Sequence, residues 1–514
     1  MASTDRRRLA SRLRIISWIA VLGLAPTVFY YTSLGTWDPR HQNVDGGWSA
    51  GFFKAQAESM LVHAKLDVNP LEIQGECFLR DSLCFGYFGV TPSLMRIPFL
   101  GISRYLHSSL TPLYLCLAIL LAYWAALQMM QRSLRESADS ARSQTYALWY
   151  FIIGAVALGP GGTLMFATRP AVYEEANAWS VAFILLAMNH VWAWYSGERR
   201  SLVPAVLFAI GAANARPTAA LTSGVLGLVV VVLWALWAMW AQSGDQDSGV
   251  VRGRDTLEAR GSARAVRPPP QTSRRVLVWA LCLALLPGLT AAGVFWLKFR
   301  TPVPSVFLNE QFHAPHWKAI LERNGDRTSG LIFTPTELVA YFRPDTVVRR
   351  DDWPLFDFRF PEEPILWVPP LPSGGAYVER FSSVTATMPL AWMVNAMVVA
   401  WFGLAAWRMA FSSRRRASSY LPTLTDPQWL LSAGLLVSAA AMAVLVVTTA
   451  GITNRYLSDF FATSVIGAAL GCRVIFPLVD RRPIVGAGMA LVAATLVVWS
   501  VIVTLSLNTR LVLM

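Results

Sequence analysis

Long apolar runs with almost no charged residues alternate with short polar segments along the chain. Most runs approach the roughly 20 residues that a helix needs to cross a hydrocarbon core about 30 Å thick. In that setting a helix satisfies its own backbone hydrogen bonds. The pattern predicts an all-α polytopic membrane protein with about eleven transmembrane helices, at residues 15–34, 109–130, 146–166, 172–194, 202–213, 218–241, 275–297, 389–411, 429–450, 458–477 and 484–507.

The amino-acid composition agrees with this pattern, because 54% of the 514 residues are hydrophobic and 21 are tryptophan. That apolar content exceeds the content of an ordinary soluble domain. The formal net charge of +13 does not indicate a nucleic-acid partner, since the excess arginine lies beside the apolar runs, where it orients the spans. We therefore expect membrane lipid, and no nucleic acid, around this protein.

Arginine-rich segments predict how the spans are oriented. With the N-terminus in the cytoplasm, the segments QRSLRESADSARSQ, SGERR, 242–274, SSRRR and DRR all become cytoplasmic. This parity requires two spans broken at NARPT, where Pro217 disfavours a continuous helix. The N-terminal run is similar to a signal peptide but is not followed by a small-residue cleavage site, so we expect an uncleaved first span in a multi-pass plasma-membrane protein.

The polar segments divide the chain into three parts. Residues 1–241 form an N-terminal transmembrane module with a first outer loop at 35–107, and residues 275–514 form C-terminal helices with a second outer loop at 298–388. Both loops contain aromatic and aliphatic residues that need burial, so they are expected to fold on the extracytoplasmic side. Residues 242–274 are rich in Gly, Ser, Arg and Pro and are predicted to be a disordered cytoplasmic linker.

The first outer loop begins with TWDPRHQNVDGGW, which carries Asp38 and Asp45 beside aromatic residues. Apolar residues at helical spacing from Trp48 to Val62 predict a helix along the membrane interface. Asp45 would then be an ordinary cap at the helix N-terminus, and Asp38 would start a turn. Alternatively, a carboxylate held ionised at headgroup level can act as general base on an acceptor hydroxyl.

Two cysteines, Cys77 and Cys84, lie close together in the same loop, outside the reducing cytoplasm. We predict that they form a disulfide, with two reduced thiols as the alternative. The other three cysteines fall in apolar runs and are expected to be small core residues; they are Cys116, Cys282 and Cys472.

Three arginines, Arg169, Arg216 and Arg455, lie at predicted outer ends of spans, against the charge bias elsewhere in the chain. An arginine at the centre of a membrane helix costs on the order of 2–3 kcal/mol, and less near the interface. Each one alone could extend to lipid phosphate. Together they indicate a bound anionic headgroup, because the planar guanidinium suits phosphate oxygens. Their polar neighbours are Tyr173, Glu174, Asn214, Tyr456 and Asp459.

The second outer loop contains His313 and His316, and several aromatic residues among acids. The histidines lack a third ligand at a fixed spacing, so no metal site is indicated. The aromatic and acidic residues suit either a sugar-binding face or a small loop core; they are Trp317, Trp353, Phe356, Phe358, Trp367, Asp351, Asp352 and Asp357. The sequence lacks a P-loop, a dinucleotide-binding glycine motif and a nucleophile elbow, so an enzyme using soluble nucleotides gains no support.

The order of several motifs resembles the polytopic glycosyltransferases of the GT-C class, especially actinobacterial arabinosyltransferase-like and mannosyltransferase-like members. The likeness spans most of the chain and rests on DGGWSAGFFKAQAESMLVHAKLDV, GYFGVTPSLMRIP, VYEEANAWSVAF, ARPT and NRYLSDF. The chain departs from the class because it lacks the paired acids of protein mannosyltransferases and a large C-terminal carbohydrate-binding domain.

The resemblance implies an inverting sugar transfer outside the cytoplasm, from a polyprenyl-phosphate donor to a glycan, lipid or protein acceptor of the cell envelope. Carried over to this sequence, Asp45 is the general base, and Asp38 is a second acid that orients the acceptor or a metal. The donor phosphate would be held by side chains at outer helix ends, namely Arg216, Arg455, Arg169 and Tyr173. Acceptor contacts are assigned to Trp48, Glu174 and Asp459. No cofactor is indicated, and the use of a divalent metal stays open.

Two other functions stay open at this point. A transporter or flippase of lipid-linked sugars would use the same arginine pocket without a catalytic base. The absence of visible repeats and of matched broken helices in the two halves argues against it. The third alternative is a noncatalytic scaffold of the envelope.

Overall fold

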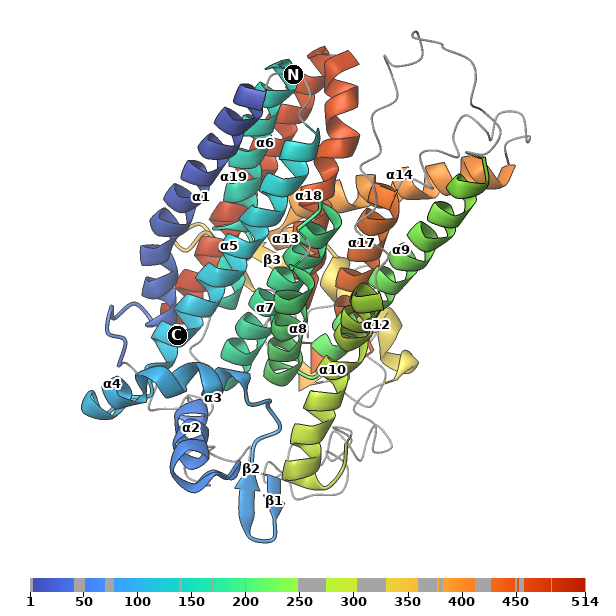
Figure 1. Cartoon of the computed structure of the whole chain (residues 1–514). Coiled ribbons are helices and arrows are strands. Elements are labelled where there is room, and N and C mark those ends of the chain that lie inside the picture. Colours follow the sequence, from blue (N-terminus) through green and yellow to red (C-terminus); the bar gives the residue numbers. More distant parts are fainter. Residues whose placement is uncertain are drawn as a thin grey trace.

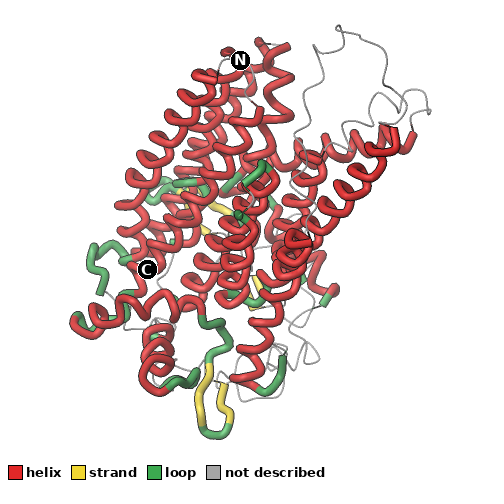
Figure 2. Tube along the Cα trace, viewed as in Figure 1, coloured by secondary structure: helices red, strands yellow, loops and turns green. Residues whose placement is uncertain are grey.

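The computed structural model describes residues 3–40, 51–69, 78–137, 141–167, 171–198, 200–247, 274–302, 330–358, 377–378, 382–411, 427–448, 451–452, 457–481 and 483–513. Most of these residues are helical (Figure 2). The long helices form a bundle with the N-terminus at one end and the C-terminus at the other (Figure 1). An odd number of membrane crossings would also place the two termini at opposite ends.

Each apolar run predicted from the sequence coincides with a helix. In chain order these are α1 (Ser3–Thr32), α5 (Thr111–Ser137), α6 (Ala141–Leu158), α7 (Val172–Tyr195), α8 (Leu202–Ala215), α9 (Ala219–Asp247), α10 (Arg274–Phe299), α14 (Pro389–Phe411), α17 (Pro427–Val446), α18 (Leu457–Arg481) and α19 (Pro483–Leu513). Within the described residues, seven helices are long and apolar enough to cross a membrane, and α8, α14 and α17 are shorter apolar helices. The protein is therefore an all-α polytopic membrane protein.

Helix α7 lies at the centre of the bundle. It packs against α5, α8 and α18, and nearly all its side chains from Val172 to Trp194 are buried. A helix that is buried on every side needs no polar face, which explains why α7 has no amphipathic pattern. Its polar residues are therefore inside the protein, and Glu175 and Ser180 are fully buried.

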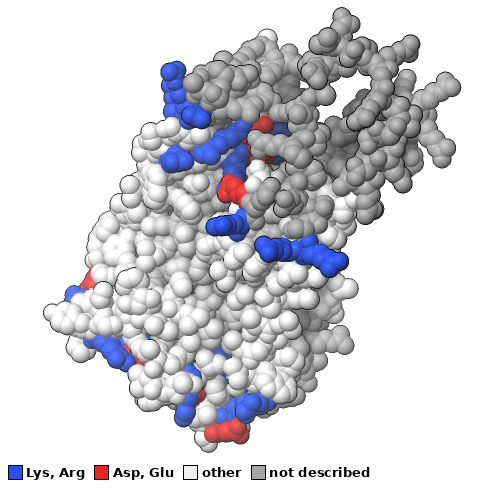
Figure 3. Space-filling view, in the orientation of Figure 1, with Lys and Arg blue, Asp and Glu red and all other residues white. Residues whose placement is uncertain are grey.

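On the face shown in Figure 3, charged residues gather at the loop-bearing end and in a group that runs from the opposite end to about the middle, and most of the remaining surface is uncharged. At the end that carries the N-terminus, Arg132 pairs with Glu198 at 2.9 Å, and Arg473 pairs with Glu136 at 2.8 Å. These pairs join α5 to α18 and to the segment after α7. A largely uncharged surface is what contact with a surrounding bilayer requires.

The first outer loop folds at the opposite end, beside the C-terminus (Figure 1). We call this the loop end of the bundle. Its elements are α2 (Phe52–His63), β1 (Phe78–Arg80), β2 (Leu83–Phe85), α3 (Thr91–Arg96), the 3-10 helix η2 (Ile97–Phe99) and α4 (Leu100–Tyr105). Strands β1 and β2 form an antiparallel hairpin with Phe78 opposite Phe85.

The predicted interfacial helix exists as α2, but its start and its buried face were predicted wrongly. It begins at Phe52 with Gly51 as its N-cap, several residues after Asp45. The residues buried are Phe52, Phe53, Gln56 and Ala57, whereas Val62 is 57% exposed. The adjacent rings of Phe52 and Phe53 pack against each other and against Phe88, which turns the buried face away from the predicted one.

The predicted break at NARPT is confirmed. Helix α8 ends at Ala215, Arg216 is extended with φ −143° and ψ 119°, and α9 begins at Ala219. A residue before proline avoids the helical region because the proline ring clashes with its backbone, so Pro217 accounts for the break.

The end of one helix and the direction of another differ from what the sequence predicts. Helix α9 continues to Asp247, past the predicted start of the linker at 242, and residues 248–273 lie outside the described part. Helix α14 has its predicted bounds but runs across the long helices rather than along them (Figure 1). Hydropathy detects an apolar helix, but it contains no information on the direction of that helix.

The second outer loop contains the 3-10 helix η6 (Leu331–Phe333), α12 (Thr334–Phe342), β3 (Val347–Arg349), β4 (Phe356–Phe358), β5 (Tyr377–Val378) and α13 (Val384–Thr387). Strands β3 and β4 pair antiparallel, and β5 pairs parallel with β6 (Gly451–Ile452).

Strand β4 packs against α19. This contact decides, for some of the loop's aromatic residues, between a sugar-binding face and a small loop core. Phe358 is buried with Val503 and Leu507, and the Phe356 ring contacts Trp499. Asp357 pairs with Arg510 at 3.0 Å. Phe356 and Phe358 therefore belong to a small loop core, whereas Trp353 is 55% exposed. The residues His313, His316, Trp317 and Trp367 lie outside the described part of the chain.

Candidate active site

A buried ion pair joins two distant predicted site residues. Nη1 of Arg216 donates to both carboxylate oxygens of Asp459 at 2.5 Å, across 243 residues of sequence. The Arg216 side chain is 14% exposed and that of Asp459 is fully buried. Two charges in an apolar setting remain ionised only if they are paired, so each residue keeps the other charged.

Local structure explains how the two side chains meet. Arg216 follows the last turn of α8, where the proline-induced break leaves its backbone extended. Asp459 lies in the first turn of α18, where unpaired N–H groups and the helix dipole favour a carboxylate.

The first outer loop lies directly on the end of α8, next to this pair. A Cβ added at Gly89 would lie 1.7 Å from the carbonyl oxygen of Asn214, so only glycine fits there. Oγ1 of Thr91 donates to the carbonyl oxygen of Gly211 at 2.8 Å. Asn214 is buried, and its Nδ2 donates to Thr290 on α10 at 2.9 Å. The GYFGVTP and NARPT motifs are therefore in contact.

The start of α7 meets the same loop through aromatic rings. The Tyr173 ring lies 4.9 Å from Phe88 and 6.0 Å from Tyr87, centroid to centroid. Glu174 follows Tyr173 and is half-buried. Tyr173, Glu174 and Arg216 thus belong to ends of α7 and α8 that pack against the loop, and Asp459 joins them through its pair with Arg216.

A second buried ion pair, Arg96 with Glu175, was missed in the sequence. Nη2 of Arg96 donates to Glu175 at 2.5 Å, and the exposed fractions of the two side chains are 2% and 0%. Arg96 also donates to the Ser109 carbonyl and to Thr111, and its guanidinium lies 4.3 Å from the Tyr114 ring centroid. The only sequence signal was that Arg96 lies between apolar neighbours in SLMRIPF, and this position does not indicate that Glu175 is its partner.

Lys298, at the end of α10, was also missed. It is fully buried, and its Nζ donates to the carbonyl oxygens of Gly86 at 3.1 Å and Phe88 at 2.5 Å. A lysine at the end of a span is common at membrane interfaces, so its sequence position gave no signal. In the structure, the hydrogen bonds of Lys298 connect the first loop to α10.

Asp38 lies near the ends of α1 and α19 instead. It accepts from the Arg40 backbone N–H at 2.8 Å and forms an ion pair with the Arg40 side chain at 3.0 Å. The hydrogen bonds from the Arg40 guanidinium to the Asp38 carboxylate raise the pKa of Arg40 above its ordinary value. Trp37 packs on Tyr30 at the end of α1. This geometry matches the turn interpretation of Asp38.

Several predicted site residues cannot be placed. Asp45, Trp48, Arg169, Arg455 and Cys77 lie outside the described residues. Cys84 is disulfide-bonded, but its pairing with Cys77 stays a prediction for that reason. Cys116, Cys282 and Cys472 are free thiols. Within the described ranges, no group of histidine, cysteine and acidic residues could hold a metal ion.

Comparison with known proteins gave one structural likeness. No protein-family model matches the chain, and no curated protein matches it. The fold is similar to that of the archaeal oligosaccharyltransferase AglB from Archaeoglobus fulgidus, solved in complex with an inhibitory peptide and a dolichol-phosphate. The TM-score is 0.44 and the sequence identity 12%, over 97% of this chain and 55% of that one. This chain thus spans about half the length of that protein.

Proposed function

We propose that this protein is a GT-C-like membrane glycosyltransferase, which transfers a sugar from a polyprenyl-phosphate donor to an acceptor hydroxyl of the cell envelope. The observation that carries the proposal is the buried Arg216–Asp459 pair, beside which the first loop, α7 and α8 come together. A soluble nucleotide sugar does not cross a membrane, so a sugar used outside the cytoplasm must arrive on a lipid.

In the proposed reaction, the acceptor oxygen attacks the anomeric carbon as the bond from that carbon to the donor phosphate breaks. The acceptor proton passes to a carboxylate, for which Asp45 is our first choice. The configuration inverts, and polyprenyl phosphate leaves with the electron pair. Positive charge beside the leaving phosphate lowers the barrier, since negative charge develops there.

Arg216 is the donor-phosphate residue for which the geometry offers most support. Asp459 fixes one guanidinium nitrogen, which orients the planar group before any donor binds. Preorganised donors cost no reorganisation during the reaction. In this proposal Asp459 positions Arg216, and Arg455, Arg169 and Tyr173 complete the phosphate site. Trp48 and Glu174 keep their proposed acceptor contacts, whereas the positioning role replaces the acceptor contact that we predicted for Asp459, which is fully buried. Asp38 stays a predicted second acid.

The test is transfer by the purified protein from a panel of radiolabelled polyprenyl-phosphate sugars to a crude envelope acceptor. We expect Asp45→Asn to retain donor binding while transfer falls by about 10²–10⁴-fold, the usual contribution of a general base. We expect Arg216→Ala to weaken donor binding. Asp81→Asn is the matched control, because Asp81 lies at the exposed tip of the β1–β2 hairpin, with a side chain 77% exposed.

One outcome would reject the proposed sugar transfer, and another would reject only the assignment of the base. Donor binding without transfer by the unaltered protein would favour a transporter or flippase of lipid-linked sugars. Full transfer activity in Asp45→Asn would remove Asp45 as the base.

A further inference from the structure

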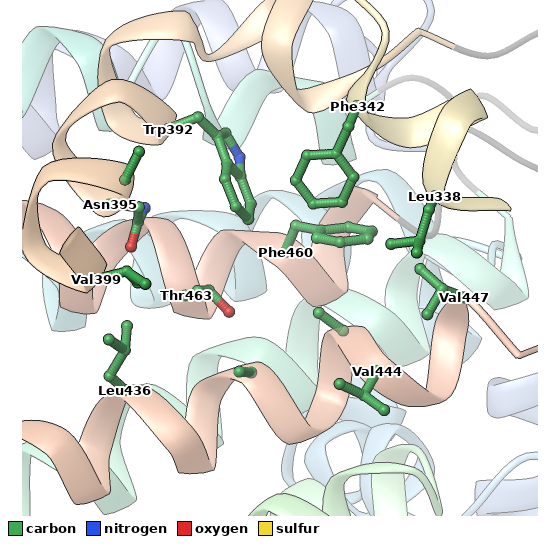
Figure 4. Close-up of a pocket in the computed structure, with 13 residues that line it drawn as sticks. Leu338, Phe342, Trp392, Asn395, Val399, Leu436, Val444, Val447, Phe460 and Thr463 are labelled. Atoms are coloured by element: carbon green, nitrogen blue, oxygen red, sulfur yellow. The ribbon is translucent and has the colours of Figure 1, made fainter. Parts of the chain in front are cut away.

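Two surfaces of the bundle have no role in the proposed sugar transfer. One is a cleft between α14, α17 and α18, whose surface is almost entirely apolar, so nothing in its described lining selects an occupant (Figure 4). The other is the end of the bundle that carries the N-terminus, where arginines of α1 and α5 gather. Charge indicates an occupant for this second surface, because guanidinium groups recognise phosphate oxygens.

Three arginines of α1 and α5 lie close together at this end. The positive charges of Arg14, on α1, and Arg132, on α5, both act on the guanidinium of Arg135. Arg132 has an acidic partner, since its Nη1 donates to Glu198 at 2.9 Å. Like charges that meet without a counterion repel each other. An anion bound beside Arg14 and Arg135 would remove that repulsion.

The acid next to Arg135 on α5 does not neutralise it. Glu136 accepts from Nη2 of Arg473 at 2.8 Å and from Nε1 of Trp192 at 3.1 Å. These contacts direct its carboxylate towards α18 and α7. Within the described ranges, Arg14 and Arg135 therefore take part in no ion pair.

A buried hydrogen-bond network holds Arg135 between α1 and α5. Its Nη2 donates to Oε1 of Gln131 at 3.2 Å. Gln131 is itself buried, and its Nε2 donates to the Leu13 carbonyl at 3.2 Å and to the Ser17 hydroxyl, both on α1. Arg135 is half-buried, and Arg14, which follows Leu13, is exposed. The half-buried guanidinium is thus oriented beside an exposed one before any anion binds.

The face of α1 that continues from Arg14 into the membrane is apolar and exposed. Trp18, one turn further along, is 51% exposed, and Leu22, after another turn, is 66% exposed. Residues four apart lie on one face of a helix, and tryptophan is common where a span enters the interface. Acyl chains attached to a headgroup at Arg14 would contact this face, which a soluble anion would not use.

We propose that the ends of α1 and α5 bind an anionic phospholipid of the surrounding leaflet. Its phosphate lies between the guanidinium groups of Arg14 and Arg135, and its acyl chains lie along Trp18 and Leu22. Arg132 adds positive charge from the preceding turn of α5. This site lies at the opposite end of the bundle from the candidate active site and does not depend on the proposed sugar transfer.

The test compares two lipids with the same acyl chains and different headgroup charge. The protein in detergent is titrated with dioleoyl phosphatidylglycerol and with dioleoyl phosphatidylcholine, and bound lipid is counted by native mass spectrometry. We expect the first bound phosphatidylglycerol to bind about 25-fold more tightly, since two arginines without an acidic partner contribute about fivefold each. Equal affinities would overturn the proposal. Displacement of the bound lipid by an equal concentration of glycerol 3-phosphate would reject a lipid as the occupant.

Variants separate a defined site from general attraction to a basic surface. Arg14→Gln with Arg135→Gln is expected to abolish the preference for phosphatidylglycerol. Arg14→Gln alone, at an exposed position that does not affect folding, should lower it about fivefold. The matched control is Arg7→Gln with Arg8→Gln, which removes the same charge from exposed positions about two turns earlier on α1 and should keep the preference. Equal losses in the two double variants would show diffuse attraction and contradict the site.

Discussion

The Arg96–Glu175 pair is the most deeply buried ion pair described here, and it joins the first loop to the central helix. Neither charge has access to water. Desolvation makes such a pair costly to form, but it makes the loss of one partner more costly still, because the other charge is left uncompensated. The fold therefore depends on both residues together.

We predict that Glu175→Ala lowers the free energy of unfolding by about 3–5 kcal/mol, because Arg96 stays buried without its partner. The double variant Arg96→Met with Glu175→Leu should recover most of that loss. The measurement is thermal unfolding in detergent, followed by tryptophan fluorescence.

The matched control is the exposed pair of Arg104 and Glu58, which are 51% and 33% exposed. Glu58→Ala should cost at most about 1 kcal/mol, since surface pairs contribute little. If Glu58→Ala and Glu175→Ala destabilise the protein equally, burial of the Arg96 pair is not the reason for its importance.

Single residues were the hardest feature to predict from the sequence. The motif VYEEANAW offers two adjacent acids, and the sequence gave no reason to prefer the buried Glu175 over the half-buried Glu174. Partners such as Arg96 and Glu175 are 79 residues apart, so only the fold brings them together. The rarity of Arg216 at an outer helix end did mark it in advance, although its partner could not be read from its position.

At the level of elements, the docking of the first loop depends on close backbone contacts. We predict that Gly89→Ala separates the loop from α8, because the added Cβ would lie 1.7 Å from the Asn214 carbonyl oxygen. The loop should then be cut faster in limited proteolysis, and donor binding should weaken.

The control for this change is Gly101→Ala in α4. A Cβ at Gly101 meets no atom within 4 Å, so alanine should be accepted and should favour the helix. Faster cleavage in Gly101→Ala than in Gly89→Ala would show that the loop responds to any glycine change.

Lys298 also connects two elements, because its hydrogen bonds link α10 to the first loop. We predict that Lys298→Met leaves the Gly86 and Phe88 carbonyls without their donor, so that residues 83–90 exchange their amide hydrogens faster. Hydrogen exchange with mass spectrometry measures this directly. Lys54→Met, on α2 and outside this contact, is the control, and unchanged exchange in Lys298→Met would contradict the role.

The extent of the elements could be predicted from the sequence, but their arrangement could not. Runs of apolar residues mark a helix wherever backbone hydrogen bonds must be satisfied internally, which is why α5, α7 and α18 were found. The direction of α14 and the buried face of α2 depend on neighbouring rings and helices, and local periodicity does not report these contacts.

At the scale of the whole molecule, the orientation in the membrane follows from the charged segments that flank the apolar helices. The arginine-rich segments favour the N-terminal end as the cytoplasmic one. The loop end would then face outward, where lipid-linked sugars are used.

We predict that a membrane-impermeant thiol reagent labels Tyr105→Cys in intact cells, because Tyr105 is 82% exposed at the loop end. Arg200→Cys, exposed at the other end, should be labelled only after lysis. The protein without added cysteines is the background control. Labelling of Arg200→Cys in intact cells would reverse the proposed orientation and place the candidate site in the cytoplasm.

Helix α8 has only 14 residues, a length of about 21 Å at 1.5 Å per residue. That is less than the roughly 30 Å of hydrocarbon in a typical bilayer. Arg216 must therefore lie below the surrounding headgroups, or the lipid must become thinner around it. The acyl-chain length of the surrounding lipid should therefore affect this protein. Short-chain lipids should reduce the mismatch, and long-chain lipids should increase it.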